Sequence, residues 1–299
     1  MPTSFKPTRR LGALLLAGAL GAVPGCTDLT ETPRDALTPA NAFRTDAEIL
    51  AGAASVYAQL RSTQWAYYNL SEITSGTQIV PTRGSDWFDN GRWLEIYRQS
   101  WNANSGSALE DMNGLWNDMF SGVAKANLMI SVVEASTSPT KEQNLAELRT
   151  LRAWFYYVLM DMFGGLPIVT TTEVQPTARA SRDSTFRFIE RELLAARAAL
   201  PERPAQYGRV GRHVANAILA NMYINAPVFQ GTVTAAGLQR AQPRYNDAIA
   251  AADLVINSGV YSLASSYNAN FSTTNESSPE NIFVIANVSN PPGLGNSFS

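Results

Sequence analysis

Residues 147–167 read ELRTLRAWFYYVLMDMFGGLP, and this stretch decides the fold class. Apolar residues recur every three to four positions from Leu148 to Leu159, which is the spacing of an amphipathic helix. The stretch closes on Gly-Gly-Leu-Pro, and glycine followed by proline is a signal that ends a helix. The apolar pattern extends upstream as well, so the sequence predicts a helix over residues 140–162.

Five further segments show the same helical periodicity of apolar residues. We expect helices over residues 46–61, 108–134, 183–199, 212–225 and 243–257. The last three begin roughly thirty residues apart, a spacing that resembles stacked helical hairpins of the tetratricopeptide kind. Asp46 and the Asp183-Ser184 pair are the expected N-caps of two of these helices.

Residues 62–107 differ from the helical segments because glycine and proline are interspersed with many aromatic residues. Long structured loops in a compact protein are usually functional. Beyond residue 260 the chain is rich in Ser, Asn and Thr, and residues 283–285 form its one strand-like run. The predicted fold class is therefore mainly α, a tetratricopeptide-like helical-hairpin scaffold with a long aromatic-rich irregular insertion and little strand.

Composition excludes several classes of function. A chain with one Cys and one His cannot form an internal disulfide, a Cys/His zinc cluster or a zinc-protease helix with two His. Without residues 1–25, which carry three basic residues and no acidic one, 20 basic side chains face 25 acidic ones, a net charge of −5. This balance gives no basic footprint for nucleic acid, and we expect no nucleic-acid partner, metal or cofactor.

Residues 1–25 have the pattern of a signal peptide, with a basic start and an apolar run over residues 11–23 that is too short to span a bilayer. The only Cys of the chain, Cys26, follows Val-Pro-Gly in an arrangement that resembles a bacterial lipoprotein box. We expect a lipoprotein signal peptide over residues 1–25, lipidation of Cys26, a tether over residues 26–40 and a body over residues 41–299. An ordinary secretory peptide with an incidental Cys is the alternative.

From Cys26 to about Ile285, the chain resembles the SusD/RagB family of outer-membrane nutrient-uptake lipoproteins. Residues 147–167 are the most specific match, and the order and spacing are supported by residues 116–127, 188–201, 208–209, 258–263 and 280–283. The resemblance implies a lipid-anchored protein of the outer membrane, facing the cell exterior. It also implies that the protein binds an oligosaccharide or a peptide nutrient and delivers it to a SusC-like TonB-dependent barrel transporter. Family members continue well beyond residue 299, so we expect a C-terminal part of the body to be missing.

Residues 83–93 read RGSDWFDNGRW and combine aromatic with polar side chains. Sugars present apolar C–H faces that stack on exposed rings, and a rim of hydroxyls that Asp, Asn and Arg can hydrogen-bond. The resemblance also places ligand contacts near this segment. The predicted ligand-binding residues are Trp87, Trp93, Asp86, Asp89, Asn90, Arg92 and Arg83. The opposing hypothesis is that these Trp rings only close an edge of the core.

Other conspicuous residues have structural explanations. Trp116 and Trp154 lie on helical stripes and are predicted to belong to the core. Arg149 and Arg152 share a face of one helix. They are expected to pair with Glu147, Asp161 or a neighbouring carbonyl. His213 is predicted to be a partly exposed helix residue without a catalytic role.

Two alternative functions remain open. A glycoside hydrolase needs two carboxylates flanking the scissile bond. Asp86 and Asp89 are close in sequence, but loop carboxylates beside Asn and Gly usually form turns or hydrogen-bond sugars, so we do not expect an enzyme. A helical-repeat scaffold that binds only protein would present a flat apolar patch instead of an aromatic cluster facing a concave site.

Overall fold

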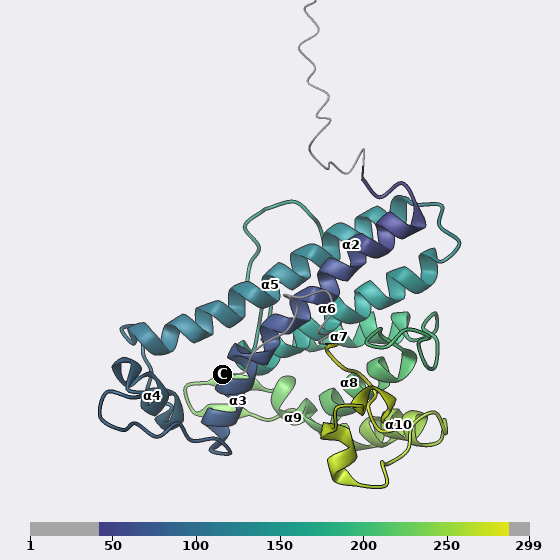
Figure 1. Cartoon of the computed structure of the whole chain (residues 1–299). Helices are drawn as coiled ribbons and strands as arrows, with labels where there is room; N and C mark the ends of the chain where they lie inside the picture. Colours follow the sequence, from purple (N-terminus) through teal and green to yellow (C-terminus); the bar gives the residue numbers. More distant parts are fainter. Residues whose placement is uncertain (1–41, 287–299) are drawn as a thin grey trace, which may run out of the picture. The chain divides into compact units, whose positions relative to one another are not determined.

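The helix predicted from residues 147–167 is the central element of the computed structural model, which describes residues 42–286. This helix, α6 (Lys141–Phe163), buries fourteen of its 23 residues, which places apolar side chains on more than one of its faces. It follows the longest helix, α5 (Gly106–Ala135), and the two pack side by side (Figure 1). Gly122 permits this close approach, because a Cβ there would lie 2.5 Å from the Phe155 ring.

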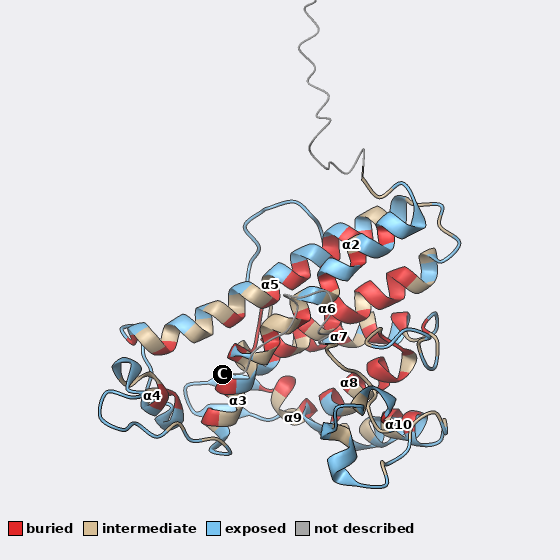
Figure 2. Ribbon diagram, in the orientation of Figure 1, coloured by how far each residue is buried: buried red, intermediate tan, exposed pale blue. Residues whose placement is uncertain are grey.

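The other helices pack on this pair in sequence. Helix α2 (Asp46–Gln59) contacts α5, and α7 (Arg182–Ala196) contacts α6. Helix α8 (Arg212–Ile224) contacts α7 and also α10 (Tyr245–Ile256). Figure 2 shows the buried residues concentrated along α5, α6, α7 and α8. These contacts between helices confirm the predicted helical-hairpin scaffold.

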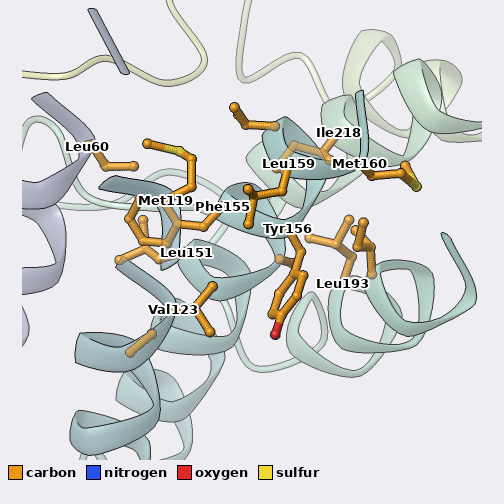
Figure 3. Close-up of a cluster of buried hydrophobic side chains, with 14 of the residues drawn as sticks. Leu60, Met119, Val123, Leu151, Phe155, Tyr156, Leu159, Met160, Leu193 and Ile218 are labelled. Carbon is orange, nitrogen blue, oxygen red and sulfur yellow. The ribbon is translucent and has the colours of Figure 1, made fainter. Parts of the chain in front are cut away.

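The core is continuous across these helices. Phe155, Tyr156, Leu159 and Met160 project from α6 toward residues of α5, α7 and α8 (Figure 3). The facing residues include Met119, Val123, Leu193 and Ile218. Trp116 and Trp154 also pack against this cluster, which confirms their predicted structural role.

The insertion is less irregular than the sequence predicts. Residues 62–107 contain α3 (Ala66–Ser75) and α4 (Arg92–Arg98) in addition to a 3₁₀ turn at Asp89–Gly91. Buried Leu70 and Ile73 define the inner face of α3 at helical spacing, but the surrounding aromatic residues conceal this pattern in the sequence. The stretch without helix is confined mainly to residues 76–88.

The short elements also differ from the predictions. The run over residues 283–285 is not a strand, whereas a hairpin forms from β1 (Thr232–Thr234) and β2 (Gly237–Gln239), with Thr232 paired to Gln239. Every residue of these two strands is exposed, so the hairpin lacks the apolar alternation by which a strand is recognised. Helix α9 (Ala226–Phe229) precedes it.

Two helix caps lie one or two residues before the predicted ones. Thr45, and not Asp46, caps α2 and forms a reciprocal capping box with Glu48. Ser181 caps α7 by accepting a hydrogen bond from the Ser184 amide. The predicted signal peptide, Cys26 and the tether lie outside the described residues, as does the C-terminal end of the predicted body.

A buried ion pair joins α6 to the segment before α8. Arg209 Nη2 donates to Glu147 Oε1 at 2.8 Å, and its Nε donates to Oε2 at 2.9 Å. The Tyr57 hydroxyl of α2 donates to Glu147 Oε2 at 2.7 Å and accepts from the Val210 amide at 3.1 Å. Burial, reinforced by the Glu147 charge, raises the pKa of Tyr57, so its hydroxyl remains a donor.

A second buried ion pair connects α5, α6 and α7. Arg152 Nε donates to Glu192 Oε2 at 2.9 Å, and Arg152 Nη1 donates to Asn127 Oδ1 at 2.8 Å. Arg149 and Arg152 were each predicted to pair with a neighbouring group, but the partners in the structure are not the predicted ones. Arg149 binds Glu134, because its side chain turns to the exposed end of α5 instead of to Glu147 or Asp161.

His213 contradicts its predicted exposure. Its side chain is in the core with only 2% of the residue exposed, and its ring lies 5.6 Å from the Tyr261 ring. Among the described residues, neither ring nitrogen has a hydrogen-bond partner. A position at the start of α8 suggested exposure, but the segment from Tyr261 covers this end of the helix.

None of the helices within residues 42–286 combines the length and the hydropathy that a membrane span requires.

Removing the buried carboxylate of Glu147 should strongly destabilise the fold. We expect Glu147→Ala to lower the free energy of unfolding by about 3–5 kcal/mol, because it leaves Arg209 without its counter-charge. The matched control is Glu134→Ala, which breaks the exposed pair with Arg149 and should cost less than about 1 kcal/mol. Urea unfolding followed by circular dichroism measures both, and equal losses would contradict the assigned role of Glu147.

His213 should make stability depend on pH in the weakly acidic range. Burial, with a smaller contribution from Arg212, lowers the pKa of His213 below 6.5, although Glu202 opposes this shift. The unfolded chain therefore takes up a proton that the folded chain resists, so stability should fall as pH drops through the ordinary His pKa. Urea unfolding at several pH values should show a smaller loss of stability at low pH in His213→Leu than in the wild type. The same pH dependence in both proteins would contradict this prediction.

Candidate ligand-binding cleft

A cleft of about 520 Å³ lies between helix α3 and the segment that follows it. We call it the aromatic cleft. Its lining residues come from the end of the 3₁₀ turn before α3, from α3 itself, from residues 78–87 and from the start of α4. They are Gln64, Trp65, Tyr68, Asn69, Gln78, Ile79, Val80, Pro81, Arg83, Asp86, Trp87 and Trp93. The cleft therefore combines aromatic rings with amide, carboxylate and guanidinium groups.

Three aromatic rings of the cleft are accessible. Trp65 is 49% exposed, Tyr68 is 52% exposed and Trp87 is 53% exposed. Trp65 and Tyr68 are three residues apart at the start of α3, so the helix holds both on the same side. Trp87 comes from the opposite wall, which lets the cleft present ring faces from two elements.

The polar rim is built by a tight turn. The Arg83 amide donates to the Asp86 carbonyl at 3.1 Å, and the Asp86 amide donates to the Arg83 carbonyl at 3.0 Å. These two bonds hold the ends of the turn together and place both side chains at the cleft. A guanidinium and a carboxylate at this position can respectively donate to and accept from a ligand hydroxyl.

Trp87 has an unusual backbone conformation. Its φ is 56°, in the left-handed region that bulky residues rarely adopt. Asp89 and Asn90 also have positive φ values, of 41° and 55°, so the strain extends over the segment. Strained residues of this kind cluster at binding and catalytic sites, where the surrounding structure holds them in place.

Trp93 supports this segment from within the fold. Only 4% of the residue is exposed, and its indole nitrogen donates to Asp89 Oδ2 at 2.6 Å. Its ring centroid lies 6.1 Å from that of Trp87, with the planes inclined at 57°. The indole of Trp93 thus forms the floor beneath Trp87, and it does not offer the open ring face that the sequence suggested.

The structure divides the predicted binding residues into two groups. Arg83, Asp86, Trp87 and Trp93 line the cleft, whereas Asp89, Asn90 and Arg92 do not. Asp89 accepts the Trp93 hydrogen bond, and Asn90 occupies the 3₁₀ turn. Arg92 pairs with Glu110 at 2.9 Å and with Asp111 at 3.6 Å.

Sequence reasoning missed three residues on the α3 side of the cleft, Trp65, Tyr68 and Asn69. The three-residue spacing of Trp65 and Tyr68 was the available signal, and it required recognising α3 as a helix. Within residues 42–286, no group of three or more His, Cys, Asp or Glu side chains could hold a metal ion.

Comparison with known proteins identifies the family. The SusD-like family described as "Starch-binding associating with outer membrane" matches residues 44–224. The chain belongs to the SusD-like family. This match contains helices α2 to α8 and both walls of the aromatic cleft, whereas α10 lies beyond it.

Individual relatives agree with this assignment. The SusD-like protein P2 of Formosa agariphila is 24% identical over 213 residues, covering 69% of this chain and 41% of that protein. The starch-binding protein SusD of Bacteroides thetaiotaomicron is 26% identical over 155 residues, covering 52% of this chain and 26% of that protein. The SusD-like chain thus spans less than half the length of these relatives.

A solved structure shows the same fold. The surface glycan-binding protein A of Bacteroides thetaiotaomicron, in complex with laminarihexaose, has a TM-score of 0.63 at 22% identity. The alignment covers 80% of this chain and 49% of that one. The tetratricopeptide-like helical architecture is therefore shared between the two proteins.

The burial of Trp93 leads to a prediction about stability. We expect Trp93→Ala to lower the free energy of unfolding by about 3–5 kcal/mol, because it opens a large cavity under the strained segment. Leu94→Ala is the control, since Leu94 is exposed on the same helix and its loss should cost below about 1 kcal/mol. Denaturant unfolding curves compare the two, and a Trp93 variant as stable as the control would place this ring outside the core.

Proposed function

We propose that this SusD-like chain binds a glycan in the aromatic cleft. The observation that carries the proposal is the presence of three exposed rings and a polar rim in one cleft. Ring faces stack on the apolar C–H faces of sugars, and the side chains of Arg83 and Asp86 can hydrogen-bond the hydroxyls. A neutral oligosaccharide has both features, whereas a purely apolar ligand would leave the rim without partners.

The strained backbone at Trp87 supports the same conclusion. A Trp with positive φ is costly, and the hydrogen bond from Thr82 Oγ1 to the Trp87 carbonyl helps to hold it. The buried Trp93 beneath it restricts the ring further. A ring whose backbone is already held in place would lose less freedom when a ligand stacks on it.

Known relatives support a glycan as the ligand class. One relative is named a starch-binding protein, and one protein of the same fold was solved with laminarihexaose. Because this chain spans only part of their length, the particular sugar and the full set of contacts do not transfer from them.

We further propose binding without catalysis. Asp86 lines the cleft, but Asp89 is engaged with the indole of Trp93. A glycoside hydrolase needs two carboxylates on either side of the scissile bond, and this pair does not meet that requirement. The bound nutrient is then delivered unaltered to a SusC-like TonB-dependent transporter.

The proposed place of this delivery is the outer face of the outer membrane. Lipidation of Cys26 would anchor the body, since acyl chains insert with about 0.8 kcal/mol for each buried CH₂ group. The family description, which names association with the outer membrane, supports this proposal. Residues 26–40 would serve as the tether between the anchor and the body.

A protein-binding scaffold is the second candidate, and helix α10 favours it. Tyr245, Ile249 and Ile256 are exposed and share one face of this helix. Exposed apolar patches commonly mark contacts with other proteins. The same surface is compatible with glycan binding at the aromatic cleft, because the two features involve different parts of the chain.

Replacing Trp87 tests the glycan proposal. We expect Trp87→Ala to weaken binding by about tenfold or more, because a stacked indole contributes on the order of 2 kcal/mol by burial. Phe88→Ala is the matched control, since Phe88 is the next residue and is 52% exposed but does not line the cleft. Isothermal titration with laminarihexaose, maltohexaose and the best ligand from a glycan array measures both variants. Equal effects of the two substitutions, or no binding of any glycan by the wild type, would refute the proposal.

A further inference from the structure

A second and larger cleft, of about 1080 Å³, lies where α6 ends and α7 begins. We call it the arginine cleft. The hairpin that contains β1 and the segment before α10 provide its other walls. Four arginines line it, namely Arg179, Arg182, Arg187 and Arg244, against one acidic residue, Asp183.

Two of the four arginines are already neutralised. Arg187 pairs with Asp183 at 3.0 Å, and Arg244 pairs with Glu190 at 2.7 Å and with Asp247 at 2.6 Å. The other oxygen of Asp183 accepts a hydrogen bond from the side-chain Nε2 of Gln230 at 2.8 Å. The single carboxylate of the cleft is thus fully engaged and does not balance the remaining arginines.

In the part of the chain that the structure describes, Arg179 and Arg182 donate hydrogen bonds only to main-chain carbonyls, and Asp161 of α6 also interacts electrostatically with Arg182. Arg179 Nε donates to the Gly165 carbonyl at 2.6 Å and its Nη2 donates to the Phe163 carbonyl at 2.8 Å. Arg182 Nη1 donates to the Val228 carbonyl at 3.4 Å. Within residues 42–286, neither guanidinium forms an ion pair. The cleft therefore carries two positive charges that no carboxylate contacts directly.

The main chain holds both guanidiniums in position. Gly164 has a φ of 81°, and a Cβ at this residue would lie 3.0 Å from Arg182 Nη2, so the guanidinium packs closely against this glycine. Arg179 is held by the two carbonyls at the end of α6. The N-terminus of the 15-residue helix α7 adds partial positive charge beside them. Charges already fixed in place bind an anion with little loss of side-chain freedom.

A hydrogen bond links helix α3, which borders the aromatic cleft, to helix α6, which ends at the arginine cleft. Trp65 and Tyr68 of α3 line the aromatic cleft, while the intervening Tyr67 donates to Asp161 Oδ2 of α6 at 3.4 Å. Two residues later, Phe163 lines the arginine cleft.

We propose that the arginine cleft binds an oxyanion group, carboxylate or sulfate, of an acidic glycan. The proposal of an oxyanion site depends only on the two arginines that form no ion pair. The further statement that a glycan supplies the anion rests on the proposed function. Guanidinium groups bind both anions through paired hydrogen bonds, so uronate residues and sulfate esters share this chemistry.

Inorganic sulfate tests the oxyanion site without any glycan. Titrated into the full chain, it should shift the Nε–Hε NMR resonances of Arg179 and Arg182 together. The resonance of Arg149, whose exposed side chain pairs with Glu134, should stay in place. Shifts that are uniform across all arginines, or absent, would overturn the proposal.

Calorimetry with matched oligosaccharides identifies the source of the anion. Oligogalacturonate and a sulfated galactan oligosaccharide are compared with the neutral galactan. We expect one acidic ligand to bind about tenfold or more tightly than the neutral one, since hydrogen bonds to charged groups contribute about 1.5–3 kcal/mol. The Arg179→Gln/Arg182→Gln double variant should abolish this preference, and the control Arg187→Gln, in the same cleft, should retain it.

The outcomes separate the two proposals. If neutral and acidic ligands bind equally well, or if the preference survives in the double variant, the proposal of an acidic ligand is wrong. Either result leaves the proposal of glycan binding intact. Sulfate-induced shifts without binding of any glycan would support the oxyanion site and refute the proposed function. If the double variant loses its helical circular dichroism, Arg179→Lys/Arg182→Lys replaces it. That variant keeps both charges but not the guanidinium geometry, so it should weaken the preference, and an undiminished preference would count against the proposal.

Discussion

The scaffold depends on two charges that helix α6 carries into the core, those of Glu147 and Arg152. A buried charge without a counter-charge is strongly destabilising, so each residue requires a partner at a definite place. They are five residues apart, which turns them about 140° from one another around the helix axis. Glu147 therefore meets Arg209 and Tyr57, while Arg152 meets Glu192. Apolar packing tolerates small shifts between helices, but these polar pairs do not. They therefore set the register of α2 and α7 against α6.

This register has consequences for the aromatic cleft. Helix α2, which carries Tyr57, continues through a 3₁₀ turn into α3, so the hydrogen bond from Tyr57 to Glu147 of α6 also helps to position Trp65 and Tyr68. The opposite wall is built differently, from a strained loop that is supported by the buried ring of Trp93. The cleft thus has a helix on one side and a loop on the other. The half-exposed Trp87 lies on the loop side.

Helices with clear apolar stripes were predictable from the sequence, and the tertiary partners of individual side chains were not. The prediction for residues 108–134 was confirmed almost to the residue because α5 has one continuous apolar face. Trp87 and Trp93 show the limit, since they are the same residue type in the same segment. Trp93 is buried because it lies in α4, which begins at Arg92, whereas Trp87 precedes this helix and is exposed. A helix as short as α4 has no apolar stripe long enough to be recognised in the sequence. Arg92 was predicted to bind ligand because a guanidinium can hydrogen-bond sugar hydroxyls, and the sequence does not reveal its pairing with Glu110 on a different helix.

Net charge and local charge carry different information in this molecule. An overall charge of −2 disfavours an extended polyanion, since nucleic acid needs a continuous basic surface. A single carboxylate or sulfate needs only two or three donors that are not already neutralised, and Arg179 and Arg182 meet that condition in an acidic chain. Ion pairing is what distinguishes them from Arg187 and Arg244 in the same cleft. Counting arginines would treat all four alike, whereas tracing each guanidinium to its partner separates those that stabilise the fold from those that remain available to a ligand.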